Sequence, residues 1–344
     1  MLVNESLSCA SDGYYNKLAF DDKCSHENIG YYGVSMTERS TMRLNRRDTL
    51  TQALTLIAAS ASAISAGCTI SADHDHTDSQ APRYEPVLNR PARVAWVFSS
   101  GGPRGFVHIG VIKALEELGL KPDLIVGGSV GALAGALYAS GMRAAKLEAL
   151  ALDLGLLEVG RWAMLGEGKF DGAPIAAQVS EQIMAQTGQQ TIEKLSIRFA
   201  AVAIEKLSRK PMVFNAGNAG TAVQASSAIE GIFTPVRIRG VQYIDADLVM
   251  PMPVRLARAM GAVKVLAIDA SAHEDKAPAG SARFKEGDLR KRALTLPDTL
   301  SADVSLQPDF GYYVNASKEF RLRCINAGYE QTMAKAQVLK ALHA

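Results

Sequence analysis

One serine in the sequence is flanked by the residue types that an enzyme nucleophile needs. Residues 127–131 read Gly-Gly-Ser-Val-Gly, which fits the pattern G-x-S-x-G. They follow the apolar run 124–126 and precede a helical run, so they predict a sharp strand-to-helix turn. Gly127 and Gly131 relieve the crowding that side chains would cause there. We therefore predict that Ser129 projects from this turn as a nucleophile, near the partial positive charge of a helix N-terminus.

A second glycine-rich loop precedes this turn in the chain. Residues 93–100 predict a buried strand that runs into Gly-Gly-Pro-Arg-Gly at 101–105, and a helical stripe follows. In a parallel sheet both loops lie at the carboxyl edge, where they can face each other. Their backbone amides are then candidates to hold an oxyanion, except at Pro103, which has no N–H. The candidate donors are Gly101, Gly102, Arg104, Gly105 and Val130. The Arg104 side chain either attracts an anionic head group or is a surface charge.

A nucleophilic serine also needs a base. Residues 240–254 contain a short strand-like run that ends just before Asp245, and a carboxylate leaving a strand at the sheet edge can reach the serine. Asp247 adds a second negative charge, which would raise the pKa of Asp245. Two other aspartates are weaker candidates. A helix cap explains Asp171, and a structural or substrate-side role suits Asp269 better.

The sequence allows three alternatives to a Ser129–Asp245 pair, and one of them is disfavoured. A Ser-Asp-His triad needs a histidine after the acid, and only His273 and His343 follow Asp245. His108 precedes the serine and is better explained by capping or packing. A dinucleotide site is disfavoured because the strand at 124–128 ends in glycine instead of an acidic residue. The third alternative is a lipid-binding protein that has kept the fold and lost turnover.

Three blocks, in this order, resemble the patatin-like phospholipase family over roughly residues 93–340. They are SSGGPRGFVHIGVIKAL, GGSVG and ASSAIEGIFTPVRIRGVQYIDADLVMPMPV. The resemblance implies a three-layer α/β/α fold with a mainly parallel central sheet. It also implies a dyad of Ser129 and Asp245 that works without a catalytic histidine, metal or cofactor. The implied substrates are acyl esters of lipids, such as phospholipids or lysophospholipids, at a membrane surface.

The chain departs from the family pattern at three positions. Ser100 stands where the first glycine of the oxyanion loop is usual, and this change leaves the donors at 102–105 intact. Ala246 follows the acid where glycine is usual, and a positive φ there would strain an alanine. Asp247 replaces a small residue. Reduced activity is therefore one expected consequence.

The N-terminal part of the sequence predicts an export signal. Residues 42–68 have a basic start that includes Arg46 and Arg47, then an apolar stretch, then Cys68, as in a twin-arginine or lipoprotein signal. We expect 1–41 to be a non-native extension, Cys68 to be a lipidation site, 69–92 to be a linker and 93–344 to be the catalytic body. These assignments predict a bacterial protein that is periplasmic or anchored to a membrane.

Composition narrows the function classes. The 37 Lys and Arg residues against 35 Asp and Glu give a net charge of +2, which does not indicate a nucleic-acid partner. Four widely spaced cysteines exclude a cysteine zinc site. Residues 144–166 predict an apolar lid or a core helix. Residues 274–303 are charged and contain proline, so we expect an exposed excursion there.

Overall fold

The computed structural model describes residues 75–77, 79–83, 86, 88–153, 171–315 and 317–344. In this part of the chain an eight-stranded sheet has the order β5-β6-β3-β2-β1-β7-β8, with β4 paired to β3 outside that path. The strands are β1 (Ala92–Phe98), β2 (Leu124–Gly128), β3 (Arg198–Glu205), β4 (Pro211–Phe214), β5 (Val236–Ile238), β6 (Val241–Asp245), β7 (Ala262–Ile268) and β8 (Val304–Leu306). The strands β3, β2, β1, β7 and β8 are parallel. Strands β4 and β6 each pair antiparallel with β3, and β5 pairs antiparallel with β6.

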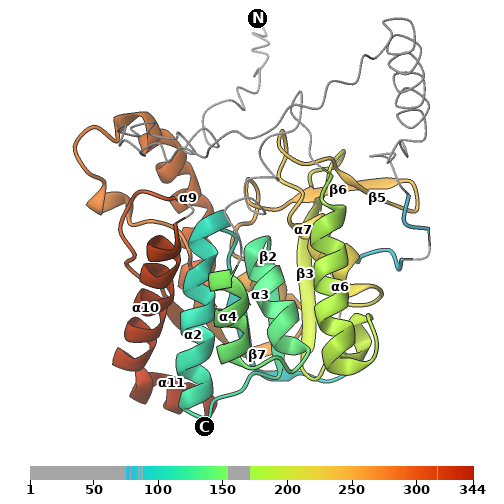
Figure 1. Ribbon diagram of the computed structural model, residues 1–344, viewed down its shortest axis with the longest axis horizontal. Coiled ribbons are helices and arrows are strands. Elements are labelled where there is room, and N and C mark those ends of the chain that lie inside the picture. Colours follow the sequence, from blue (N-terminus) through green and yellow to red (C-terminus); the bar gives the residue numbers. More distant parts are fainter. Residues whose placement is uncertain (1–74, 78, 84–85, 87, 154–170, 316) are drawn as a thin grey trace, which may run out of the picture. The chain divides into compact units, whose positions relative to one another are not determined.

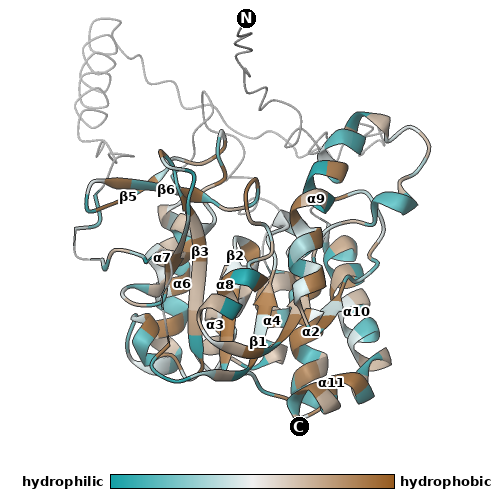
Figure 2. Cartoon of the chain, turned by 180° about the vertical axis from the view of Figure 1, so that it is seen from behind, coloured by the Kyte–Doolittle hydropathy of each residue, from teal (hydrophilic) through white to brown (hydrophobic). Residues whose placement is uncertain are grey.

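Helices cover both faces of this sheet (Figures 1 and 2). One face carries most of them, and the short helix α8 crosses the other. The helices are α2 (Phe106–Glu117), α3 (Val130–Ala139), α4 (Ala144–Asp153), α6 (Ala173–Thr187), α7 (Ala219–Ser226), α8 (Val254–Ala259), α9 (Lys285–Ser301), α10 (Lys318–Ala334) and α11 (Ala336–His343), with short 3-10 turns η1 (Gly102–Gly105), η2 (Ile192–Lys194), η3 (Glu274–Lys276) and η4 (Ala282–Phe284). The expected α/β fold with a mainly parallel central sheet is confirmed.

The central strand β1 shows why the sheet is covered on both sides. Successive side chains of a strand point to opposite faces. Trp96 and Phe98 belong to the core beneath α2 and α3, while Ala95 and Val97 belong to the core beneath α8. All four are fully buried. A strand that is apolar on both faces is typical of a parallel sheet between helices, as the sequence pattern predicted.

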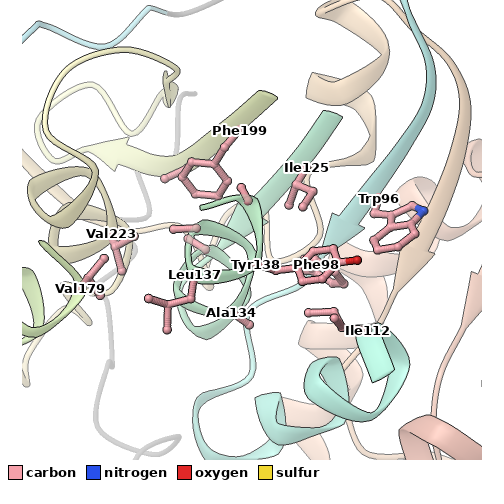
Figure 3. Packing of buried hydrophobic residues seen from close by; sticks show 14 of the residues in the cluster. Trp96, Phe98, Ile112, Ile125, Ala134, Leu137, Tyr138, Val179, Phe199 and Val223 are labelled. Carbon is pink, nitrogen blue, oxygen red and sulfur yellow. The ribbon is translucent and has the colours of Figure 1, made fainter. Parts of the chain in front are cut away.

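Helix α3 lies close to the sheet at the centre of the larger core (Figure 3). Small residues on its inner side bring it against Phe98, Ile125 and Phe199. At Gly135 an added Cβ would lie only 2.8 Å from Ile125. The close approach fixes where α3 begins, and therefore where Ser129 lies.

Helix α9 is polar on its inner side. Its buried residues are Asp288, Lys291, Thr295 and Asp298, whereas Leu289 and Leu300 are exposed. The expectation of an exposed excursion at 274–303 is therefore wrong for this helix, because one side of it is buried against the body. Its hydrophobic pattern gave no sign of this, since the buried side carries charges.

Parts of the chain before β1 also contact the body. Arg83 pairs with Val213 in an antiparallel bridge, and the backbone amide of Leu88 donates to Met260. The predicted extension, signal sequence and Cys68 lie outside the described residues, and so does the part 154–166 of the segment 144–166 that was predicted to be a lid or a core helix. None of the helices in the described ranges has the length and apolar character that a membrane crossing requires.

Candidate active site

Ser129 lies at the junction of β2 and α3 in an unusual backbone conformation. Its φ is 52° and its ψ is −124°, a combination that costs energy for a residue with a side chain. The backbone amide of Ser129 donates to Ser226 Oγ at 2.8 Å. The Ser226 hydroxyl in turn donates to the carbonyl of Val202 on β3 at 2.6 Å. These two bonds tie the strained turn to the neighbouring strand, and the turn has the form expected of a nucleophile elbow.

The two glycines of the elbow permit its tight packing. A Cβ at Gly131 would lie 2.5 Å from the carbonyl oxygen of Phe98 at the end of β1. A Cβ at Gly127 would lie 2.5 Å from the carbonyl oxygen of Gly131. Both contacts are with backbone atoms, which cannot move aside as a flexible side chain can. Glycine is therefore required at both positions for α3 to start where it does.

The second glycine-rich loop forms η1 and packs against the elbow. A Cβ at Gly105 would lie 2.2 Å from Val130 Cγ1, so this glycine permits the contact between the two loops. The Arg104 amide donates to the Gly101 carbonyl at 3.2 Å. That bond engages the Arg104 amide within the turn. Gly101 precedes η1, and Gly102 and Val130 are the first residues of η1 and α3. Amides at the start of a helix have no partner within it, and we find no partner for these three within the described ranges.

The Arg104 side chain turns inward from this loop. It is 7% exposed, which excludes the surface-charge interpretation. Its Nε and Nη2 atoms have no hydrogen-bond partner among the described residues. The side chain lines a small cavity together with Ser271 and Lys291.

Asp245 is the last residue of β6 and lies beside the elbow because of the strand register. Asp245 pairs with Ala203 on β3, and Gly128 of β2 pairs with the adjacent Val202. Oδ1 of Asp245 accepts the backbone N–H of Asp247 at 2.8 Å. Oδ2 is buried and has no hydrogen-bond partner of normal length in the described part of the chain. One carboxylate oxygen thus stays available, and the Ser129 hydroxyl lies close enough to affect the pKa of Asp245.

The surroundings of Asp245 disfavour its charged form. Burial raises the pKa of Asp245 from 3.8 to about 7, and the negative charge of Asp247 contributes to the rise. The nearby Ser129 hydroxyl, the Asp247 amide and the charge of Lys291 oppose it. The predicted effect of Asp247 on this pKa is therefore confirmed in direction. A carboxylate with a pKa near neutrality is a better proton acceptor than an ordinary aspartate.

Asp247 itself stays charged because it has partners that Asp245 lacks. Oδ1 accepts hydrogen bonds from the Ser100 hydroxyl and the Lys291 ammonium group. Burial alone would raise the pKa of Asp247, but Lys291, Ser100 and the charge of Arg104 outweigh it, so the pKa is lowered. Lys291 was not predicted from the sequence, and neither was the bridging role of Ser226. The only sequence signal for Lys291 was Asp247 itself, because a buried carboxylate needs a cation.

The departures from the family pattern at Ala246 and Ser100 are both accommodated. Ala246 is fully buried. Among the described non-glycine residues only Ser129, Arg209 and Arg239 have a positive φ, so the backbone at Ala246 is not in that region. The expected strain at Ala246 is therefore absent. Ser100, which replaces a glycine, bonds Asp247 and the Pro251 carbonyl, the latter at 3.2 Å.

The histidines have partners away from the serine. His273 Nε2 lies 3.0 Å from the Gln307 carbonyl, and His343 Nε2 accepts the indole N–H of Trp96 at 3.0 Å. His108 is buried in the first turn of α2, where its Nε2 lies 2.9 Å from the Ser99 carbonyl. Burial lowers the pKa of His108 to about 4. The geometry therefore gives no support to a Ser-Asp-His triad.

The weaker aspartate candidates have structural partners. Asp171 accepts the Ala173 amide at 2.9 Å at the start of α6, as a capping role predicts. Asp269 accepts the Ser271 amide at 2.9 Å within its own loop. No cluster of three or more His, Cys, Asp or Glu side chains among the described residues is arranged to hold a metal ion.

Comparisons with known proteins agree with this geometry. The profile of the patatin-like phospholipases matches residues 96–258. An uncharacterized NTE family protein of Mycobacterium tuberculosis is 32% identical over 199 residues, which are 57% of this chain and 53% of that protein. The lysophospholipase NTE1 of Coccidioides immitis is 29% identical over 189 residues, which are 54% of this chain and 12% of the relative.

Among solved structures, VipD from Legionella pneumophila aligns with a TM-score of 0.43 and 15% identity, over 77% of this chain and 71% of that one. The chain spans about half the length of the mycobacterial relatives that it matches. The matched region holds both glycine-rich loops, Ser129 and Asp245. Residues 96–258 of this chain are therefore similar in sequence to the patatin-like phospholipases.

Proposed function

We propose that this protein hydrolyses carboxylic esters of lipids through a Ser129–Asp245 dyad and an acyl-enzyme. The observation that carries the proposal is the position of a strained, buried serine beside a carboxylate whose Oδ2 has no other partner. The match to the patatin-like phospholipases and the similarity to a lysophospholipase support a lipid ester as substrate. Phospholipids and lysophospholipids are the substrate classes that we propose.

In the first half of the reaction, Ser129 Oγ attacks the ester carbonyl while Asp245 Oδ2 takes the hydroxyl proton. The oxyanion that forms is held by the amides of Gly101, Gly102 and Val130. Collapse breaks the bond to the leaving alcohol, which receives the proton from Asp245. The acyl group remains on Ser129 as an ester.

In the second half, Asp245 acts again as a base. It removes a proton from a water molecule that attacks the acyl-enzyme, and the same amides hold the second oxyanion. Collapse releases the fatty acid and returns the proton to Ser129. Each donor of this kind contributes about 3 kcal/mol to stabilisation of the transition state in other enzymes.

Hydrolysis of a lysophospholipid and of a diacyl phospholipid by single-residue variants tests this function. We expect Ser129→Ala and Asp245→Asn each to lower kcat by at least about a thousandfold, with the fold intact by circular dichroism. His273→Ala is the matched control and should keep its activity. Loss of activity in the folded His273 variant would instead favour the triad.

We also propose that the protein is exported and acts at a membrane surface, with Cys68 as the lipidated residue. The basic and apolar segment 42–68 supports this. Metabolic labelling with a fatty-acid probe tests it, with Cys68→Ser as the control. Equal labelling of the two proteins would refute lipidation at Cys68.

A further inference from the structure

A buried ion pair lies directly behind the proposed base. Asp247 is 8% exposed and Lys291 is 6% exposed, and their side chains are in contact. Asp247 stands two residues after Asp245, whereas Lys291 comes from the inner side of α9. The structure therefore brings a distant helix into contact with the loop that carries the acid.

The pair also reaches the loop that carries the oxyanion donors. Lys291 Nζ donates to Ser100 Oγ at 3.0 Å, and the Ser100 hydroxyl donates to Asp247. Ser100 immediately precedes Gly101 and Gly102. Three side chains from three separate segments thus form one closed network that contacts both halves of the proposed active site.

We propose that Asp247 and Lys291 are positioning residues for the Ser129–Asp245 reaction, holding a second negative charge beside Asp245 and joining the acid loop to the oxyanion loop. This inference rests on the proposed function, because it needs Asp245 to act as the base. It goes beyond the family resemblance, in which a small residue stands at the position of Asp247.

Energetics favour a functional reason for this pair. Removing two charges from water costs several kcal/mol per ion, and apolar residues of similar size are often at least as stabilising in a core. A buried pair next to a proposed catalytic group therefore points to a role beyond packing. Its two charges act on Asp245 with opposite signs: Asp247 raises the pKa of Asp245 and Lys291 lowers it.

Other charged groups around the pair are few. Arg104 on η1 is the further cation whose charge acts on Asp247. Asp288, Arg292 and Glu274 line the same small cavity as Lys291. Asp288 accepts the hydroxyl of Tyr312, and Arg292 lies 3.4 Å from Glu274. These three therefore have partners of their own.

The test is the pH dependence of kcat/KM for ester hydrolysis in four proteins. Asp247→Asn removes the like charge, so the midpoint of the acid limb should fall by about one pH unit. Lys291→Met removes the opposing charge, so the midpoint should rise, by less than it falls in Asp247→Asn. The double variant, which removes both charges of the pair, should lie between Asp247→Asn and the wild type, because the Asp247 effect is the larger one.

Asp298→Asn provides the matched control. Asp298 is a fully buried acid on the same helix, and it accepts three hydrogen bonds from Arg255. The change should destabilise α9 and leave the midpoint in place. If the Asp247–Lys291 pair had a purely structural role, all the variants would likewise lose stability without a change in the midpoint.

The outcomes separate the two proposals. The inference is supported if the midpoints rise in the order Asp247→Asn, double variant, wild type, Lys291→Met. If a single variant does not fold, the double variant still provides a test. Midpoints that all agree with the wild type, in active and folded proteins, overturn the inference alone. A wild type that hydrolyses no ester, or a Ser129→Ala variant that stays active, overturns the proposed function instead.

Discussion

The serine turn at 127–131 and the acid loop at 245–247 meet beside the same part of the sheet, but different contacts hold them. The turn is shaped by close approaches of glycine to neighbouring backbone, as at Gly131 against the end of β1. The acid loop is shaped by charge, through Ser100 and the distant Lys291. The first region is therefore sensitive to volume, and the second to charge and pH.

The largest expected effect concerns volume in the serine turn. Gly131→Val places side-chain atoms where even a Cβ would lie 2.5 Å from the Phe98 carbonyl oxygen. We expect a loss of about 3 kcal/mol in the free energy of unfolding, measured by urea denaturation. Gly172→Ala is the control, because its nearest neighbour is the flexible Gln224 side chain at 3.1 Å. Equal losses in both variants would contradict the volume argument.

The next effect concerns pH in the acid loop. Asp245 must be ionised to accept the proton, and its pKa is raised to about 7. The wild-type kcat/KM should therefore be high above pH 7 and fall about tenfold for each pH unit below it. Hydrolysis rates between pH 5 and pH 9 measure this. A limb with its midpoint near pH 4 would show that Asp245 is an ordinary carboxylate.

The raised pKa of Asp245 should also make the free energy of unfolding depend on pH. A raised pKa means that the folded state binds the proton more tightly, so the stability from this group is present below pH 4 and is lost as the pH rises through about 7. Asp245→Asn removes the buried charge and should raise the free energy of unfolding at pH 8 by about 2 kcal/mol. The gain should vanish near pH 4. A gain of equal size at both pH values would point to packing instead of charge.

The smallest effect concerns the bridge between the serine turn and β3. Ser226→Ala deletes the acceptor of the buried Ser129 amide, which should lower kcat about tenfold through the position of Ser129 and leave KM nearly unchanged. Ser180→Ala is the control, since this buried serine lies on α6 and bonds Asn218. If kcat is unchanged in a folded Ser226→Ala variant, the bridge does not position the nucleophile.

The same contrast explains what the sequence could predict. The G-x-S-x-G turn, the second glycine-rich loop and the short strand before Asp245 are local patterns, and the structure brings all three together. Lys291 is different, because the apolar residues of its helix, Leu289, Leu296 and Leu300, are exposed, and the charged side is buried. Helix α9 turns Asp288, Lys291 and Asp298 inward, so a search for hydrophobic periodicity would assign the opposite side of this helix to the core.

The sequence also could not predict that the Arg104 amide donates to the Gly101 carbonyl within the turn. It depends on the exact course of η1, which begins with Gly102 at a φ of 53°. A glycine-rich string indicates that amides are exposed near a helix start, but not which of them the turn itself uses. Residue spacing therefore predicted the site, and tertiary contacts decided its donors and its charges.

The most direct test of the Ser129–Asp245 dyad is covalent labelling with a fluorophosphonate, located by peptide mass spectrometry. We predict one adduct, on Ser129, and a labelling rate at pH 8 that falls at least about a thousandfold in Asp245→Asn but is unchanged in His273→Ala. An adduct on another residue, or an Asp245→Asn variant that labels as fast as the wild type, would contradict the account.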